Sequence, residues 1–196
     1  MLVYAGLLTR GDVVGFRRSV MLASLAISSA IALAGCAAFP PAPSTVGSDW
    51  PSTGVPSAVR WPSDWVDSLS GESEAVGGPI VGLRLEYVAE HWVWRIRSTD
   101  PGRTDALGES NAEPTSGVEA LVDATDLSLV RRHEVTLTKA EATRTDTSYY
   151  DAVNASGEEW PGPRLVELER VVDDRRPTWR VTTYDTEDGD LAPRTL

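Results

Sequence analysis

The chain has 196 residues, and its 18 basic against 29 acidic residues give a formal net charge of −11 at pH 7. Phosphate-rich surfaces are bound by basic faces, and the sequence shows no basic cluster of that kind, so no nucleic acid is expected as a partner. Hydrophobic residues make up 41% of the chain, an ordinary value for a globular protein. All seven tryptophans lie after Cys36, which places the expected core in the later part of the chain.

An uncharged apolar stretch near the N-terminus has the features of a secretory signal. Arg17 and Arg18 precede residues 20–34, which contain no charged side chain, and this order matches the n-region and h-region of an export signal. A bilayer span needs about 20 apolar residues, so the stretch is short for one. We therefore expect residues 1–35 to be a signal peptide that is removed on export.

The only cysteine of the chain follows directly, in the sequence Leu-Ala-Gly-Cys at residues 33–36. This tetrapeptide resembles the lipobox of bacterial lipoproteins. In that family the cysteine thiol takes a diacylglycerol through a thioether, the peptide is cut before the cysteine, and the new amine can take an acyl chain such as palmitate. The resemblance implies lipidation of Cys36 and anchoring at the extracytoplasmic face of the cell membrane, for which two acyl chains suffice. The alternative is an unmodified, buried Cys36 at the end of a signal anchor.

Residues 36–60 are rich in proline, serine and glycine. Such a composition is typical of an extended linker, so we expect a disordered tether that holds a globular domain away from the membrane. Trp61 and Trp65 stand at the end of this stretch. We expect them to pack onto the following domain, although the repeated Trp-Pro-Ser and Asp-Trp elements also suit binding of a partner.

Two segments with a period of two, residues 80–88 and 92–98, predict an antiparallel hairpin. Its apolar face is predicted to hold Val81, Leu83, Leu85, Tyr87, Trp92, Trp94 and Ile96. The opposite, outward side is predicted to hold Gly82, Arg84, Glu86, Arg95 and Arg97. A polar loop over residues 98–117 and two further strands, over residues 118–124 and 129–137, are expected next.

The period then changes to that of a helix. Thr138 and Glu141 have the spacing of a capping box, which predicts a helix that begins there, continues to Ala155 and ends at Gly157. A second pair of strands is expected over residues 164–172 and 178–184. Leu85-Glu86 and Trp94-Arg95-Ile96 of the first hairpin match Leu168-Glu169 and Trp179-Arg180-Val181 of the second, which indicates a duplication.

This order of elements resembles the PepSY family. The matching residues are Trp94-Arg95-Ile96, the stretch Leu-Val-Asp-Ala-Thr at residues 121–125, and the capped helix that begins at Thr138. Members of the family are short modules of one helix packed on a small antiparallel sheet, found in propeptides of secreted metallopeptidases and in envelope proteins. The resemblance implies an α+β fold of two tandem PepSY-like repeats, at residues 61–137 and 138–196, with the helix of the first copy between residues 65 and 76.

No spacing typical of a catalytic or metal-binding motif stands in the sequence. His91 and His133 occur singly and are expected to be structural. Residues 185–190, Asp-Thr-Glu-Asp-Gly-Asp, resemble part of a calcium loop, but the chain ends before a closing glutamate could follow, so a solvated turn is expected. We therefore predict no catalytic residue, no cofactor and no metal site, and a protein that is not an enzyme.

Two hypotheses for the function remain. The first is a membrane-anchored envelope lipoprotein that binds or regulates a protein partner, for which the PepSY resemblance implies a secreted peptidase or another envelope protein. The second is an envelope lipoprotein that binds a small ligand or a cation, through its acidic surface or a cleft between the repeats.

Overall fold

The computed structural model describes residues 38–65, 77–100 and 115–196. The predicted signal peptide, Cys36, the expected first helix after residue 65 and most of the polar loop lie outside the described residues. Among the residues that are described, no helix is long and apolar enough to cross a membrane.

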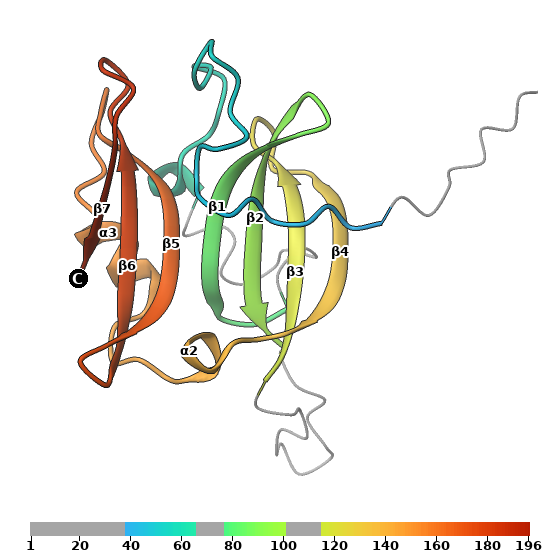
Figure 1. The fold of residues 1–196 in the computed structure, drawn as a ribbon, viewed down its shortest axis with the longest axis vertical. Coiled ribbons are helices and arrows are strands. Elements are labelled where there is room, and N and C mark those ends of the chain that lie inside the picture. Colours follow the sequence, from blue (N-terminus) through green and yellow to red (C-terminus); the bar gives the residue numbers. More distant parts are fainter. Residues whose placement is uncertain (1–37, 66–76, 101–114) are drawn as a thin grey trace, which may run out of the picture. The chain divides into compact units, whose positions relative to one another are not determined.

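The described residues form a single antiparallel sheet of seven strands (Figure 1). The strands lie side by side in the order β4-β3-β2-β1-β5-β6-β7. Their bounds are β1 (Ile80–Val88), β2 (His91–Thr99), β3 (Ser116–Asp123), β4 (Leu129–Thr136), β5 (Arg164–Asp173), β6 (Arg176–Tyr184) and β7 (Leu191–Thr195). The first six confirm the strands that the alternation predicted.

The predicted fold class, an α+β fold with a separate small sheet and one helix in each of two PepSY-like modules, is wrong. β1 and β5 pair antiparallel, with Leu83 opposite Leu168, and this pairing joins the two predicted hairpins into one sheet. The helices in the second half of the chain are short, α2 (Lys139–Ala142) and α3 (Tyr149–Ala155), and residues 62–65 are also helical. A module of about 60 residues buries too little surface to be more than marginally stable, and the joined sheet lets both hairpins share one core.

The helix predicted from Thr138 to Gly157 is divided into these two pieces. The capping box is confirmed, because the Thr138 hydroxyl accepts from the Glu141 N–H and the Glu141 carboxylate accepts from the Thr138 N–H. The chain leaves the helix at Thr143, whose backbone is extended. Threonine has a low helix propensity, and a second N-cap, Ser148, starts α3 after the threonine-rich stretch.

β7 is a strand that the sequence did not predict. It pairs with β6 along its whole length, with Pro193 opposite Thr182. A proline in a short segment argues against a strand, since it cannot donate to a ladder. β7 tolerates Pro193 because it is an edge strand of the sheet.

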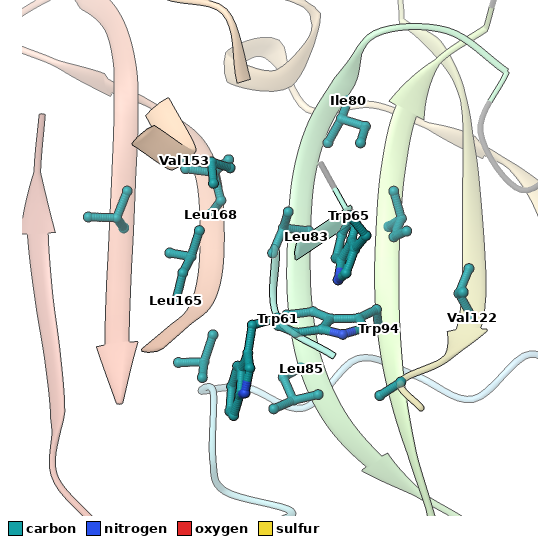
Figure 2. Packing of buried hydrophobic residues seen from close by; sticks show 14 of the residues in the cluster. Trp61, Trp65, Ile80, Leu83, Leu85, Trp94, Val122, Val153, Leu165 and Leu168 are labelled. Atoms are coloured by element: carbon teal, nitrogen blue, oxygen red, sulfur yellow. The ribbon is translucent and has the colours of Figure 1, made fainter. Parts of the chain in front are cut away.

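One face of the sheet carries the hydrophobic core, seen in Figure 2 between the β1–β2 hairpin and β5. Trp61 and Trp65 pack into this core, as predicted, and the indole N–H groups of Trp65 and Trp94 both donate to the Arg60 carbonyl, at 3.2 and 2.9 Å. The apolar face of the first hairpin is confirmed apart from Val81 and Tyr87, and Tyr87 is half-buried and contacts Trp92 at its edge. A register shift between Ile80 and Gly82 places Ile80 in the core cluster, whereas Val81 is buried outside it.

Residues 38–50, which we call the N-terminal strap, are not the disordered linker that their composition predicted. The strap crosses the sheet from β4 to β1 (Figure 1). Its carbonyls accept hydrogen bonds from arginines of three strands: Arg131 to Ala38 (3.0 Å), Arg95 to Pro40 (3.0 Å) and Arg84 to Pro43 (2.7 Å). Proline has no N–H to satisfy, and an extended proline-rich chain keeps its carbonyls free. The composition that suggested a linker therefore also suits a strap bound to arginines.

The far end of the strap completes the pairing of β1. β1 is paired with β5 only over residues 82–84, so the next backbone groups of β1 need other partners. The Trp50 indole N–H donates to the Leu85 carbonyl at 3.3 Å, and the Tyr87 N–H donates to the Asp49 carboxylate. Two side chains of the strap thus take the place of a strand partner.

Candidate functional site

A network of buried charges lies on the sheet face beneath the N-terminal strap. The residues predicted to point outward from the first hairpin do point away from the core, but the strap covers Arg84 and Arg95, and Arg97 is bound by Glu141 of α2. Arg95 at its centre is 3% exposed and Glu86 is fully buried. The predicted face is correct and its predicted exposure to solvent is wrong, because the segment that covers it has the composition of a free linker.

Arg95 is bound by carboxylates on two sides. Its Nε and Nη2 donate to the two oxygens of Glu86, at 2.7 and 2.8 Å, and its Nη1 donates to Glu119. Arg97 bridges Glu119 and Glu141, which extends the network to α2. Burial raises the pKa of Glu86 above its ordinary value of 4.5, although the hydrogen bonds from Arg95 favour the charged carboxylate. The hydrogen bonds of Arg95 all go to groups of the domain itself, so this arginine serves the fold.

A second feature is a groove around Trp160, whose side chain is 77% exposed. The groove, with a volume of about 410 Å³, is lined by Ser57, Ala58, Val59, Arg60, Trp61, Asp64, Trp160 and Arg164. Trp160 belongs to the loop between α3 and β5, where the Glu159 N–H donates to the Pro163 carbonyl at 2.9 Å. A large aromatic side chain held outside the core is unusual for a residue type that is mostly buried.

Arg164 forms the floor of this groove. Its guanidinium carbon lies 4.9 Å from the Trp61 ring centroid and 5.6 Å from that of Trp160, so both indoles make cation–π contacts with it. Its charge is balanced by Glu158, at 3.4 Å, and Asp64, at 3.8 Å. Arg164 is 4% exposed, so a partner would meet Trp160 and the exposed groove residues Ser57, Ala58, Arg60 and Asp64.

Glu158 ties the groove to the core side of the sheet. Its carboxylate accepts from the Ser63 hydroxyl at 2.9 Å and from the Ser63 N–H at 3.2 Å. Burial raises the pKa of the Glu158 carboxyl above its ordinary value of 4.5, whereas the Ser63 hydrogen bonds and the charge of Arg164 act in the opposite direction.

A third feature is a cleft of about 760 Å³ beside the segment that joins α2 to α3. The described residues that line it include Arg144, Asp146, Tyr149 and Arg170. Arg170 stacks on Trp179, with 5.1 Å between its guanidinium carbon and the ring centroid, and donates to two carbonyls of the α2 end. Burial lowers the pKa of Arg170 from its ordinary value. The cleft wall therefore presents cationic groups.

The residues that were candidates for catalysis or metal binding in the sequence are dispersed. His91 is exposed at the start of β2, and His133 on β4 stacks on Phe39 at 3.7 Å between ring centroids. Residues 185–190 form the turn before β7, in which the Asp185 carboxylate accepts from two backbone N–H groups. Within the described part of the chain, no group of three or more His, Cys, Asp or Glu residues is placed to hold a metal ion.

The candidate lipidation site, Cys36, lies outside the described residues. Neither the Trp160 groove nor the strap was predicted. The available signal for the groove was the Trp-Pro-Gly-Pro sequence that begins at Trp160. Proline and glycine favour a loop, so this sequence predicts that Trp160 lies in a loop and not in a strand. For the strap, composition alone does not separate a free proline-rich chain from a bound one.

The chain was compared with known proteins. No family model matches it, PepSY included, and no curated protein does. A solved crystal structure described as a candidate lipoprotein from Clostridium difficile 630 shares 10% sequence identity with it, over 68% of this chain and 91% of that one. The TM-score is 0.32, and a likeness of this size establishes neither a common fold nor a common function.

The buried pair of Arg95 and Glu86 gives a first prediction. We expect Arg95→Met to lower the free energy of unfolding by about 3–5 kcal/mol, because the Glu86 carboxyl is left in a buried site without its partner. Arg180→Met is the matched control, since Arg180 and Glu169 form an exposed pair and such pairs contribute at most about 1 kcal/mol. Urea unfolding measures both, and equal losses in the two variants would contradict the buried role of Arg95.

Glu158 gives a prediction on pH dependence. Its raised pKa means that the folded state holds the proton more tightly than the unfolded state, so this contribution to stability is present below the unfolded pKa and is lost as pH rises through the folded pKa. Glu158→Gln cannot titrate. We expect the free energy of unfolding of the variant to rise relative to the natural protein between about pH 4 and about pH 7. A difference that stays constant or falls over this range in urea unfolding would show that the pKa is not raised.

Proposed function

We propose that this protein is a lipid-anchored lipoprotein of the bacterial cell envelope, held at the extracytoplasmic face of the cell membrane through Cys36, whose sheet domain binds a protein partner without catalysing a reaction. The exposed Trp160 beside its arginine floor is the observation that carries the binding role. The sequence of residues 17–36 supports the anchoring.

The anchoring rests on the order of features along the chain. A basic pair, a short uncharged run and a Leu-Ala-Gly-Cys sequence stand in succession, as in exported proteins whose cysteine is lipidated before the signal peptide is cleaved. A single myristoyl-sized chain gives only marginal binding, whereas a diacylglycerol supplies the two chains that stable attachment needs. The lone Cys36 thus has a chemical role that a packing residue would not require.

The binding role rests on the chemistry of the Trp160 groove. Tryptophan and arginine are the residue types that dominate the energies of protein interfaces. Trp160 is 77% exposed, so a partner could bury most of its ring, and its loop is held in place by hydrogen bonds to Pro161 and Pro163. An exported or membrane protein is the partner that such a location makes available. A secreted peptidase is one class of exported protein that could be this partner.

A second candidate is the binding of a small ligand in the cleft beside the α2–α3 segment. Arg144 and Arg170 on its wall favour a ligand with a carboxylate or phosphate group over a cation. A thermal shift with inorganic phosphate and with small dicarboxylates would favour this candidate if it raised the melting temperature in the natural protein and not in Arg144→Ala.

The anchoring predicts the behaviour of Cys36→Ala. We expect the natural protein in the membrane fraction of cells and the variant either released from it or retained uncleaved as a precursor, because the thioether cannot form. Immunoblotting of soluble and membrane fractions, with the mobility of the band, measures the outcome. A mature-sized Cys36→Ala protein that stays in the membrane fraction would contradict the proposed anchor.

The binding role predicts the behaviour of Trp160→Ala. In cells treated with a short cross-linker, we expect a protein partner to be joined to the natural chain and to be at least tenfold less abundant with the variant. With the identified partner, loss of a central tryptophan should weaken binding by about 2 kcal/mol, or about 30-fold.

Val172→Ala is the matched control, because Val172 is also an exposed apolar residue, at 51%, and lies at the other end of β5. Its partner yield should equal that of the natural protein. A partner that cross-links equally well to Trp160→Ala would remove the groove from the binding surface.

A further inference from the structure

We propose that the β4 edge of the sheet lies against the surface of the lipid bilayer, where the N-terminal strap holds it. The inference rests on the proposed lipidation of Cys36 and adds an orientation to it. The occupant of this edge is a lipid surface, and the domain is not held away from the membrane by a free linker.

The chain between the proposed anchor, Cys36, and the sheet is very short. Ala38 is the second residue after Cys36, and a chain extends at most about 3.6 Å per residue, so the two Cα atoms are at most about 7 Å apart. The Ala38 carbonyl accepts a hydrogen bond from Arg131 of β4 at 3.0 Å. A diacylglycerol on Cys36 must therefore enter the bilayer beside β4.

The second step is the strength of the hold at this point. Phe39 packs on His133 of β4, at 3.7 Å between ring centroids, and on Arg95 of β2, at 5.3 Å from the guanidinium carbon. Pro40 then accepts from Arg95. Three successive strap residues contact the sheet, so the sheet cannot rotate freely about the strap. The position of the lipid in the bilayer therefore restricts how the sheet is oriented relative to the membrane.

The third step is the surface that β4 presents. Leu129 and Val130 are 41% and 55% exposed at the start of this edge strand. The register shift opposite Leu121 leaves Val130 as the extra residue of a bulge. Exposed apolar side chains at a strand edge are normally avoided in soluble domains, and an interfacial lipid environment would cover them.

The charges around this segment set the extent of the contact. The exposed Arg132 lies two residues after Val130 and suits the phosphate level of the headgroups. Asp126 and Glu134 are exposed on either side of it. The contact is therefore confined to the first part of β4 and does not require a strongly anionic membrane.

The orientation leaves the Trp160 groove accessible. The loop that carries Trp160 precedes β5, which is separated from β4 by β3, β2 and β1 in the sheet. Trp160 and the edge that meets the lipid therefore belong to different halves of the sheet, although the opposite wall of the groove reaches the end of β3, where the Arg60 N–H donates to the Ala124 carbonyl at 2.7 Å.

The test uses the mature chain, residues 36–196, which contains the whole sheet and its core. Its only thiol, Cys36, is coupled to a maleimide phospholipid in phosphatidylcholine vesicles, and amide hydrogen exchange is compared with that of the uncoupled chain. We expect exchange in β4 to slow at least about threefold on coupling, and exchange in β7, the opposite edge, to stay unchanged.

Two variants make the result specific. A flexible insert of twelve glycine and serine residues between Ala37 and Ala38 should abolish the slowing in β4. Leu129→Ser with Val130→Ser should abolish at least half of it. No slowing in β4, equal slowing in β7, or slowing that survives either change overturns the proposal.

Pairing between the β4 edges of two copies would give a different result. Exchange in β4 would then slow with protein concentration in the uncoupled chain, and this result also overturns the proposal. Because the lipid is attached chemically, the test does not depend on lipidation in cells. An unmodified Cys36 in the native protein would overturn the proposed anchor. It would not change the hydrogen-exchange result, which reports how the sheet lies on the bilayer when a lipid is attached at Cys36.

Discussion

Arg95 and Glu86 form an ion pair inside the sheet, and the N-terminal part of the domain is arranged around it. Removing two charges from water costs several kcal/mol for each ion, and the cost is offset only when the remaining donors and acceptors are also satisfied. Glu119 and the Pro40 carbonyl accept two further hydrogen bonds from Arg95. The strap and the charged face are therefore expected to fold together, and the pair holds the strap in place at Pro40.

This constraint connects the anchor with the shape of the domain. A proline-rich segment after a lipidated cysteine is ordinarily a spacer, and here almost all of it is bound to the sheet. Under the proposed lipidation of Cys36, the lipid, the strap and β4 form one continuous attachment, while Trp160 lies beside β5 on the other half of the sheet. A protein partner could then be bound at a fixed distance and orientation from the membrane, without any movement of the domain.

Local patterns in the sequence predicted the local structure well. Six strands, both hairpins, the capping box at Thr138 and the packing of Trp61 and Trp65 follow from alternation, turn residues and caps that act within a few positions. The joining of the hairpins through Leu83 and Leu168 was missed, since pairing between strands far apart in sequence leaves no periodic signal. Binding of the strap was missed because its partners, Arg84, Arg95 and Arg131, looked like ordinary solvent-facing residues. β7 was missed because it contains Pro193. Proline is excluded from central strands, where its missing N–H would leave a gap in the ladder, but it is tolerated in an edge strand such as β7.

The central claim is that a lipid on Cys36 and a folded sheet are only two residues apart. The intact mass of the native protein, extracted from membranes with detergent, tests this most directly. The account predicts a chain that begins at Cys36 and carries a diacylglycerol, with or without a further acyl group on its amine. A mass that corresponds to an unmodified cysteine, or to a chain that begins elsewhere, would contradict it.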